Sequence, residues 1–508
     1  MINRIFNRNF IINAILNFTV LGRLGLVPTK SITCFFVGPR PNLPSHKRTL
    51  RVALINLLLF NALLMPSAYA YNPYSTNELE QLEKQFIQLI NQSDQVERNP
   101  LAAEYINHLG HELSRDAPMQ TPVFFIVKSS EINAFAGPGG YIGINSALIL
   151  ATKNESELAA VMAHEMSHVR LHHLYRMIQH QKQMRAPMLA SLLASVALGI
   201  INPTLASGAV AASLTGFAQD SINFTRSNEK EADRIGIDML IKAGFNPRSM
   251  ASFFKKMQEN SRYYYTANIP AILRSHPLDE DRIAEAENRS ANIKKTNYRD
   301  TIDYHLFKEI IRNAVNQNAK EELDFYKSEC QKHNNQNACA YGLVLTLLSL
   351  NQFQEAKLHL TPLLNGDLNN LFYQFAMADA EIGEKQYNEA IKRLHDVQGD
   401  FPDSYAALMN YAESLLAAGN SQAAASLLLK GFRQFKHDLP LCELLAQTEA
   451  LAHQKGYAYL TQSQCYLLQG RRFDALRQLE QAKLFAKKDH YLMERADAMI
   501  DSIKSMNQ

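Results

Sequence analysis

The C-terminal half of the chain contains an internal repeat, which limits the folds available to it. Three short segments recur at intervals of 34 residues: Phe353-Gln-Glu-Ala356, Tyr387-Asn-Glu-Ala390 and Ser421-Gln-Ala-Ala424. A further copy at 470–475 is displaced by an extra half repeat. A 34-residue period is typical of paired helices that must stack to bury their apolar faces. From about Thr301 onward the sequence therefore predicts an α-solenoid, whose concave face binds peptides or partner proteins or, alternatively, serves as a structural brace.

Composition and charge exclude several classes of protein. The chain has 508 residues, of which 46% are hydrophobic and 20% charged, so a disordered or fibrous protein is excluded and two or three domains are expected. Residues 1–70 contain eight Lys or Arg and no acidic residue, whereas the remainder contains 44 basic and 49 acidic residues. The main body of the chain is thus acidic, and we expect no nucleic-acid partner.

The first 70 residues are predicted to be a leader region, not part of the fold. Three basic residues precede an apolar run at 52–64, and Ala68-Tyr69-Ala70 matches the small-x-small pattern of signal peptidase sites. We expect a signal peptide at about 47–70 with cleavage near Ala70, which would release a secreted chain. Because this signal starts late, either the true translation start lies downstream or the apolar stretch 11–21 has a separate role.

Cysteine usage agrees with export. Besides Cys34 of the leader region, the chain has an even number of cysteines, namely Cys330, Cys339, Cys442 and Cys465. Three pairings are possible, and the expectation by proximity is Cys330 with Cys339 and Cys442 with Cys465. Free buried thiols are the alternative. The spacing does not match that of a cysteine metal site.

The motif that carries chemistry is His164-Glu165-Met166-Ser167-His168. It lies in a predicted helix at about 155–179, which begins with the capping residue Asn154. Histidines four residues apart share one face of a helix, so both imidazoles can bind one metal ion. Glu165 beside them is placed to accept a proton from the attacking water. A polar face of an amphipathic helix is the alternative, but the surrounding small and apolar residues predict burial, where two imidazoles need a partner.

A catalytic zinc usually has three protein ligands, so a third is expected elsewhere. The helical segment 228–236 contains Glu229 and Asp233 on one face, with Glu231 pointing elsewhere. We predict Glu229 as a ligand and Asp233 as an acceptor for a histidine N–H. Two further histidines, His172 and His173, are expected to have a structural or supporting role, because three ligands on one helix cannot surround an ion tetrahedrally.

Three motifs in order, HEMSH, ExEAD about 60 residues later and Ser275-His276-Pro277, resemble the zinc metallopeptidase family that contains the HtpX heat-shock protease, the mitochondrial Oma protease and the CAAX prenyl protease. The resemblance implies one Zn²⁺ per chain, with His164, His168 and Glu229 as ligands and Glu165 as general base. In the periplasmic branch of that family, His276 would be a fourth ligand or latch; a turn histidine before a proline is the alternative.

Upstream of the motif, 124–127 and 141–144 are predicted to be short strands around a glycine-rich turn. The family resemblance implies that an edge strand here, at Asn133, Ala134 and Phe135, pairs with an extended peptide. An ordinary hairpin is the alternative. Main-chain pairing would favour unfolded or strand-like substrates.

Residues 186–219 form an uncharged apolar segment between the two zinc motifs. Asn202-Pro203 and several glycines and serines interrupt it, so a true membrane span is not favoured. We expect either a lid with peripheral membrane contact, which would place the protein at the outer membrane, or core packing.

Together these features predict a mainly α protein with a small β-sheet. A gluzincin-type metallopeptidase domain at 71–290 would precede an α-solenoid of tetratricopeptide repeats at 291–508. The expected function is that of a periplasmic zinc endopeptidase that degrades misfolded or stalled outer-membrane proteins and assists their assembly. The repeats would contact the outer-membrane assembly machinery. The rival hypothesis is a latched, chaperone-like scaffold in which zinc is mainly structural.

Overall fold

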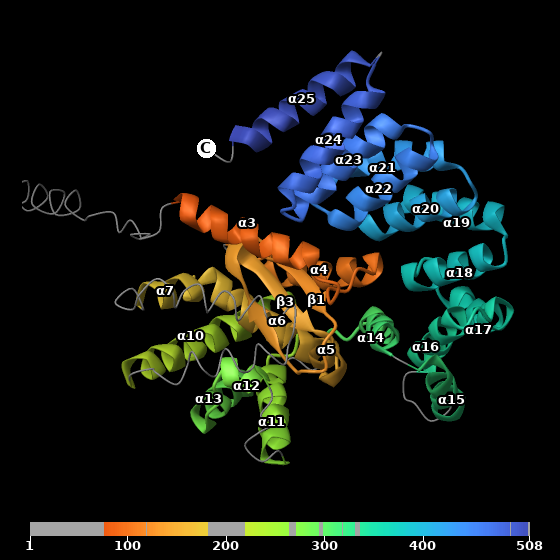
Figure 1. Ribbon diagram of the computed structural model, residues 1–508. Helices are drawn as coiled ribbons and strands as arrows, with labels where there is room; N and C mark the ends of the chain where they lie inside the picture. The colour runs from red at the N-terminus through yellow and green to blue at the C-terminus, as the bar shows by residue number, and fades with distance from the viewer. Residues whose placement is uncertain are drawn as a thin grey trace, which may run out of the picture. The chain divides into compact units, whose positions relative to one another are not determined.

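The computed structural model describes residues 76–117, 119–180, 219–263, 271–293, 298–316, 318–330, 336–487 and 489–505 (Figure 1). The predicted leader region 1–70 lies outside these residues, and so does the apolar segment 186–219 except for Gln219. In the described part of the chain, no helix is both long and apolar enough to cross a membrane.

The N-terminal part, residues 76–293, consists of helices around one small sheet. Its elements are α3 (Thr76–Gln92), α4 (Pro100–Ser114), β1 (Val123–Val127), β2 (Ala134–Ala136), the 3-10 turn η1 (Pro138–Gly140), β3 (Tyr141–Asn145), α5 (Ser146–Ala151), α6 (Glu155–Arg170), α7 (His173–His180), α10 (Gln219–Ala243), α11 (Arg248–Tyr263), α12 (Ala271–Ser275) and α13 (Glu280–Ala291).

The sheet has the strand order β1-β3-β2. β3 pairs in parallel with β1, with Val123 opposite Tyr141, and antiparallel with β2, with Ala134 opposite Ile144. The two strands predicted from sequence are therefore present, but they do not form a hairpin with each other. The glycine-rich segment between them supplies the short strand β2, which returns as the hairpin partner of β3 and lies at an edge of the sheet.

Helix α6 is buried along nearly its whole length, which explains its weak alternation of polar and apolar residues. The side chain of Asn154 accepts a hydrogen bond from the backbone N–H of Glu157, as its capping pattern predicts. The predicted end at about 179 is wrong, because α6 stops at Arg170 and α7 starts at His173. Between them His172 has a φ of 54°, in the left-handed region that ends helices.

The C-terminal part, residues 298–505, is entirely helical within its described residues, and successive helices pack on one another (Figure 1, green to blue). Its helices are α14 (Ile302–Val315), α15 (Ala319–Glu329), α16 (Gln336–Ser349), α17 (Phe353–Gly366), α18 (Leu371–Gly383), α19 (Tyr387–Asp400), α20 (Tyr405–Ala417), α21 (Ser421–Gln434), α22 (Leu439–Leu451), α23 (Lys455–Leu468), α24 (Arg472–Phe485) and α25 (His490–Ser505).

The 34-residue period is visible in the helix starts. Helices α17, α19, α21 and α23 begin at Phe353, Tyr387, Ser421 and Lys455, so the period continues one step beyond the three matching segments. The displaced copy at 470–475 opens α24, half a repeat later. Each unit buries small residues such as Ala390, Ala424 and Ala475, which lets neighbouring helices approach closely.

Both expected disulfides are present. Cys330–Cys339 joins the end of α15 to α16, and Cys442–Cys465 joins α22 to α23. The two cysteines of the second bond are fully buried within the repeat core. The pairing by proximity in the sequence is thus confirmed.

Candidate metal centre and active site

Two packed helices bring the predicted ligands together. His164 and His168 lie one turn apart on α6, and Glu229 projects from α10, which runs against α6. Gly236 permits this close contact, because a Cβ atom there would lie 3.3 Å from backbone atoms of Ala163 and His164. The absence of a side chain at this position therefore determines how near Glu229 can come to the histidines.

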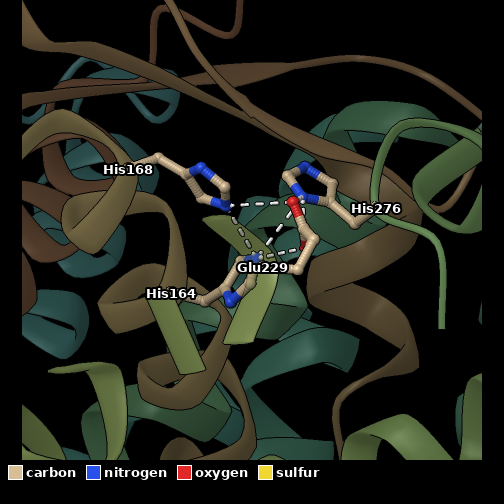
Figure 2. Close-up of side chains that lie close together, drawn as sticks. All are labelled: His164, His168, Glu229 and His276. Atoms are coloured by element: carbon tan, nitrogen blue, oxygen red, sulfur yellow. Dashed lines mark hydrogen bonds and ion pairs between the residues drawn. The ribbon is translucent and has the colours of Figure 1, made fainter. Parts of the chain in front are cut away.

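The donor atoms of these three residues have the spacing of a tetrahedral metal site (Figure 2). Nε2 of His164 lies 3.1 Å from Nε2 of His168 and 3.3 Å from Oε2 of Glu229. Nε2 of His168 lies 3.4 Å from Oε1 of Glu229. Donors bound tetrahedrally to zinc at 2.0–2.1 Å are separated by about 3.3 Å from each other. The three side chains thus fit around one divalent cation without rearrangement.

His276, between α12 and α13, completes the group. Its Nδ1 lies 3.3 Å from Nε2 of His164 and 3.2 Å from both carboxylate oxygens of Glu229. One donor atom from each of His164, His168, Glu229 and His276 lies within 4.8 Å of the others. The loop after α12 therefore presents an imidazole where a fourth ligand would bind, as Figure 2 shows.

The second ring nitrogen of His164 is held by a buried ion pair. Its Nδ1 lies 2.9 Å from Oδ1 of Asp233, the residue predicted to support a histidine. Arg282 of α13 donates two hydrogen bonds to Asp233, of 2.8 and 2.9 Å, and its Nη1 lies 3.1 Å from Glu229. Asp233 and Arg282 therefore hold both the ring of His164 and the carboxylate of Glu229.

The buried charges balance one another. Burial by itself would raise the pKa of Glu229, but the surrounding imidazoles of His276, His168 and His164 hold it well below its usual value. Burial likewise opposes ionisation of Asp233, whose pKa is nevertheless lowered by His164 and Arg282. Burial would lower the pKa of His164, yet these two carboxylates raise it to about 10. By contrast, the pKa of His168 is lowered, chiefly by burial. Two imidazoles and the ionised carboxylate of Glu229 are a donor set suited to a divalent cation.

Glu165 lies beside the group and is almost completely buried, with 1% of its surface exposed. Among the described residues neither of its carboxylate oxygens has a hydrogen-bond partner. The Nε2 atom of His276 lies 3.4 Å from Oε1. A buried carboxylate that accepts no hydrogen bond is costly unless a cation lies nearby, and the donor group beside Glu165 is where such a cation would bind.

An open groove of about 720 Å³ leads to these residues. It is lined by Glu165, His168, Glu229 and His276 on one side and by the strand β2 and η1 on the other. Of the predicted substrate strand, Phe135 lines the groove, Ala134 is fully buried, and the carbonyl of Asn133 accepts a hydrogen bond from the backbone of β3. An extended chain in the groove would thus run beside a sheet edge.

The sequence did not point to Arg282, and for His173 it predicted a structural or supporting role without naming a partner. Arg282 is buried at 2% exposure and contacts two carboxylates about 50 residues upstream. His173 contacts His168 directly, with 2.9 Å between their Nδ1 atoms, and Glu231 faces His173. Glu231 points away from the donor group, as expected, and its carboxylate lies beside His173. The sequence around Arg282 does not mark it as part of the site, because the carboxylates that it contacts, Glu229 and Asp233, are distant in sequence.

The chain is similar to known metallopeptidases over most of its length. The family model described as Peptidase family M48 matches residues 100–290, and a Tetratricopeptide repeat model matches residues 381–448. The "Beta-barrel assembly-enhancing protease" of Escherichia coli (strain K12) is 34% identical over 414 residues, which cover 81% of this chain and 84% of that protein. The protein of the same name from Yersinia pestis is 32% identical over 416 residues, covering 81% of this chain and 85% of that one.

A shorter relative matches less than half of the chain. "Metalloprotease LoiP" of Escherichia coli (strain K12) is 25% identical over 237 residues, which cover 45% of this chain and 88% of that protein. The residues matched by the family model, 100–290, include all four residues of the donor group.

Proposed function

The chain belongs to peptidase family M48, among the beta-barrel assembly-enhancing proteases, and on this premise we propose that it is a periplasmic zinc endopeptidase that degrades misfolded or stalled outer-membrane proteins and assists their assembly. The names of its relatives support this class of substrate. The basic and apolar pattern before Ala70 and the two disulfides support an oxidising compartment outside the cytoplasm.

One observation carries the catalytic part of the proposal, namely the spacing of 3.1–3.4 Å among the donor atoms of His164, His168 and Glu229 beside Glu165. Two imidazoles and one carboxylate favour zinc over calcium or magnesium, which prefer oxygen ligands. These three residues would hold the ion and leave a fourth position for substrate or water.

When bound, the zinc ion supplies a Lewis acid that polarises the scissile carbonyl and increases the acidity of the attacking water. Glu165 accepts the proton of that water as the new C–O bond forms. It then donates the same proton to the leaving nitrogen, so that the C–N bond breaks to give a carboxylic acid and an amine, and the acid proton passes to the amine or to solvent. Its buried oxygens accept no hydrogen bond from the described residues, which suits this exchange, and Nε2 of His276 lies 3.4 Å from Oε1.

The substrate would lie in the groove as an extended segment beside β2. Main-chain hydrogen bonds to a strand edge recognise the backbone more than the side chains. Phe135 and the glycines of η1 line the same groove, and they leave room for varied side chains. Such a site would act on polypeptides that expose unpaired strands, which is the condition of a stalled β-barrel protein.

The substitution Glu165→Gln tests the proposal. We expect the variant to keep one zinc per chain, because residue 165 is not a ligand, while casein hydrolysis falls by a factor on the order of 10² to 10⁴. Zinc is measured by atomic emission and hydrolysis by release of labelled peptides. Glu259→Gln, at an exposed position of α11, is the control and should match the wild type. Retained hydrolysis by Glu165→Gln would exclude the proposed base.

We further propose that His276 holds the enzyme latent by occupying the fourth ligand position. Substituting His276 by Ala would free that position and raise basal hydrolysis of casein several-fold. The exposed His359→Ala is the matched control. Lower activity of the His276 variant would instead mean that this imidazole assists the reaction.

A second function is favoured by the same histidine. With four protein donors around one ion, the zinc would be structural and the chain would act as a chaperone-like scaffold, with the repeats binding the assembly machinery. Rescue of an outer-membrane assembly defect in cells separates the two functions. The scaffold alone predicts full rescue by Glu165→Gln, whereas the protease predicts none.

A further inference from the structure

The two histidines of α6 differ in what holds their second ring nitrogen. Nδ1 of His164 faces the carboxylate of Asp233, whereas Nδ1 of His168 faces another imidazole, with 2.9 Å to Nδ1 of His173. His173 is 4% exposed. Metal-binding histidines usually donate their other N–H to a fixed acceptor, which selects the tautomer and the ring orientation. His173 lies where that acceptor is required for His168.

This contact depends on the break between α6 and α7. Residues five apart on a continuous α-helix point about 140° away from each other, so His168 and His173 could not meet on one. The left-handed conformation of His172, with φ of 54°, ends α6 and turns the chain back. The amide of Arg176 then donates to the carbonyl of His172 and starts the next helical turn. A non-glycine residue in this conformation is uncommon, and here it brings His173 beneath the ring of His168.

Beyond His173 the contacts continue to a carboxylate. Nε2 of His173 lies 3.4 Å from Oε2 of Glu231, and Nη1 of Arg176 donates to the same oxygen at 3.1 Å. An imidazole that donates from Nε2 to a carboxylate presents an unprotonated Nδ1. That nitrogen accepts the Nδ1–H of His168, which leaves Nε2 of His168 with a free lone pair directed at the donor group.

We propose that His173 is a positioning residue, which holds His168 in its metal-binding tautomer through a chain that ends at Glu231. The inference rests on the proposed zinc site but concerns a residue that is not a ligand. Each ligand histidine of α6 thus has its own support, an ion pair for His164 and a neutral imidazole for His168.

Zinc affinity of the purified protein, measured by competition with a chelating dye, tests this role without any protease substrate. We expect His173→Phe, which fills the space but offers no acceptor, to weaken zinc binding by a factor on the order of 10 to 100. His173→Gln, whose side-chain oxygen accepts a hydrogen bond, should stay within about threefold of the wild type. His172→Asn is the control, because the residue is exposed and asparagine tolerates the left-handed conformation.

Two further measurements separate positioning from a packing role. In the Co²⁺ protein, His173→Phe should shift the visible absorption bands, whereas His172→Asn should not. In the Co²⁺ wild type, the Nδ1 proton of His168 should give a slowly exchanging NMR signal, because it is largely shielded from solvent and hydrogen-bonded to His173. This second measurement needs no variant, so the proposal can be tested even if His173→Phe fails to fold.

Unchanged zinc affinity of His173→Phe, or a rapidly exchanging Nδ1 proton in the wild type, would overturn the proposal. A wild type that binds no zinc would instead refute the proposed function itself, so the two failures are distinguishable.

Discussion

The buried carboxylates of the metal centre and Glu449 of the repeats differ in the direction of their pKa shifts. In the metal centre Glu229 and Asp233 are buried beside imidazoles and Arg282, and the pKa of each is lowered. In the repeats Glu449 of α22 is 4% exposed, and within the described residues one of its oxygens has no hydrogen-bond partner. The effect of burial there outweighs the hydrogen bond with Thr461 and the positive charge of Arg495, so the pKa of Glu449 rises to about 7.

The difference shows that burial alone does not prepare a carboxylate for metal binding. Desolvation favours the neutral acid in both places, and only nearby positive charge keeps the group ionised. In the metal centre the imidazoles supply this charge for Glu229, and His164 and Arg282 supply it for Asp233. At Glu449 of the repeats the charge of Arg495 does not offset burial, so an ionised carboxylate at that position is destabilising.

The largest effect is expected from removing the guanidinium. Arg282→Met would leave Glu229 and Asp233 without their fixed cation, and loss of one partner of a buried ion pair lowers the free energy of unfolding by about 4 kcal/mol. Denaturant unfolding with a chelator present measures this loss. Arg289→Met, at an exposed position of the same helix, is the control. A loss below about 1 kcal/mol would mean that the two parts do not differ as described.

A smaller effect is expected from the covalent link in the repeats. Replacing both Cys442 and Cys465 by Ala opens a loop of 23 residues and should lower the free energy of unfolding by about 3 kcal/mol. Zinc affinity should not change, because the bond lies outside the metal centre. Replacing Cys330 and Cys339, which close a shorter loop, should cost somewhat less. A loss of zinc binding in either variant would contradict the separation of the two parts.

The smallest effect is expected at Glu449 and depends on pH. Its pKa of about 7 in the folded chain exceeds the ordinary value of 4.5. Between these values the folded chain binds more protons than the unfolded one, so stability falls as pH rises through this window. Glu449→Gln should therefore stabilise the protein by roughly 2 kcal/mol at pH 8 and not at pH 4.

Urea unfolding at the two pH values checks this prediction. The exposed Glu480→Gln is the control and should show no such difference between them. Equal stabilisation by Glu449→Gln at both pH values would mean that this carboxylate stays ionised when buried.

Local spacing predicted much of this architecture from the sequence. Helical spacing places His164 above His168 and Glu229 on the face of Asp233, and the 34-residue period predicts the stacked pairs. The break at His172 was not predicted, because no glycine marks it. The parallel pairing of β1 with β3 was missed because β2 is only three residues long. Arg282 could not be found, since its role depends on carboxylates that meet it only in the folded chain.

Gly236 sets the distance between α10 and α6 at the metal centre. It lies about two helical turns from Glu229 on α10, and because it has no Cβ atom, α10 can pack closely against α6. An alanine at this position would push the two helices apart by a few tenths of an ångström. The carboxylate of Glu229 would then move away from the imidazoles of α6. The geometry of the metal centre, and with it hydrolysis, thus depends on the lack of a Cβ atom at residue 236.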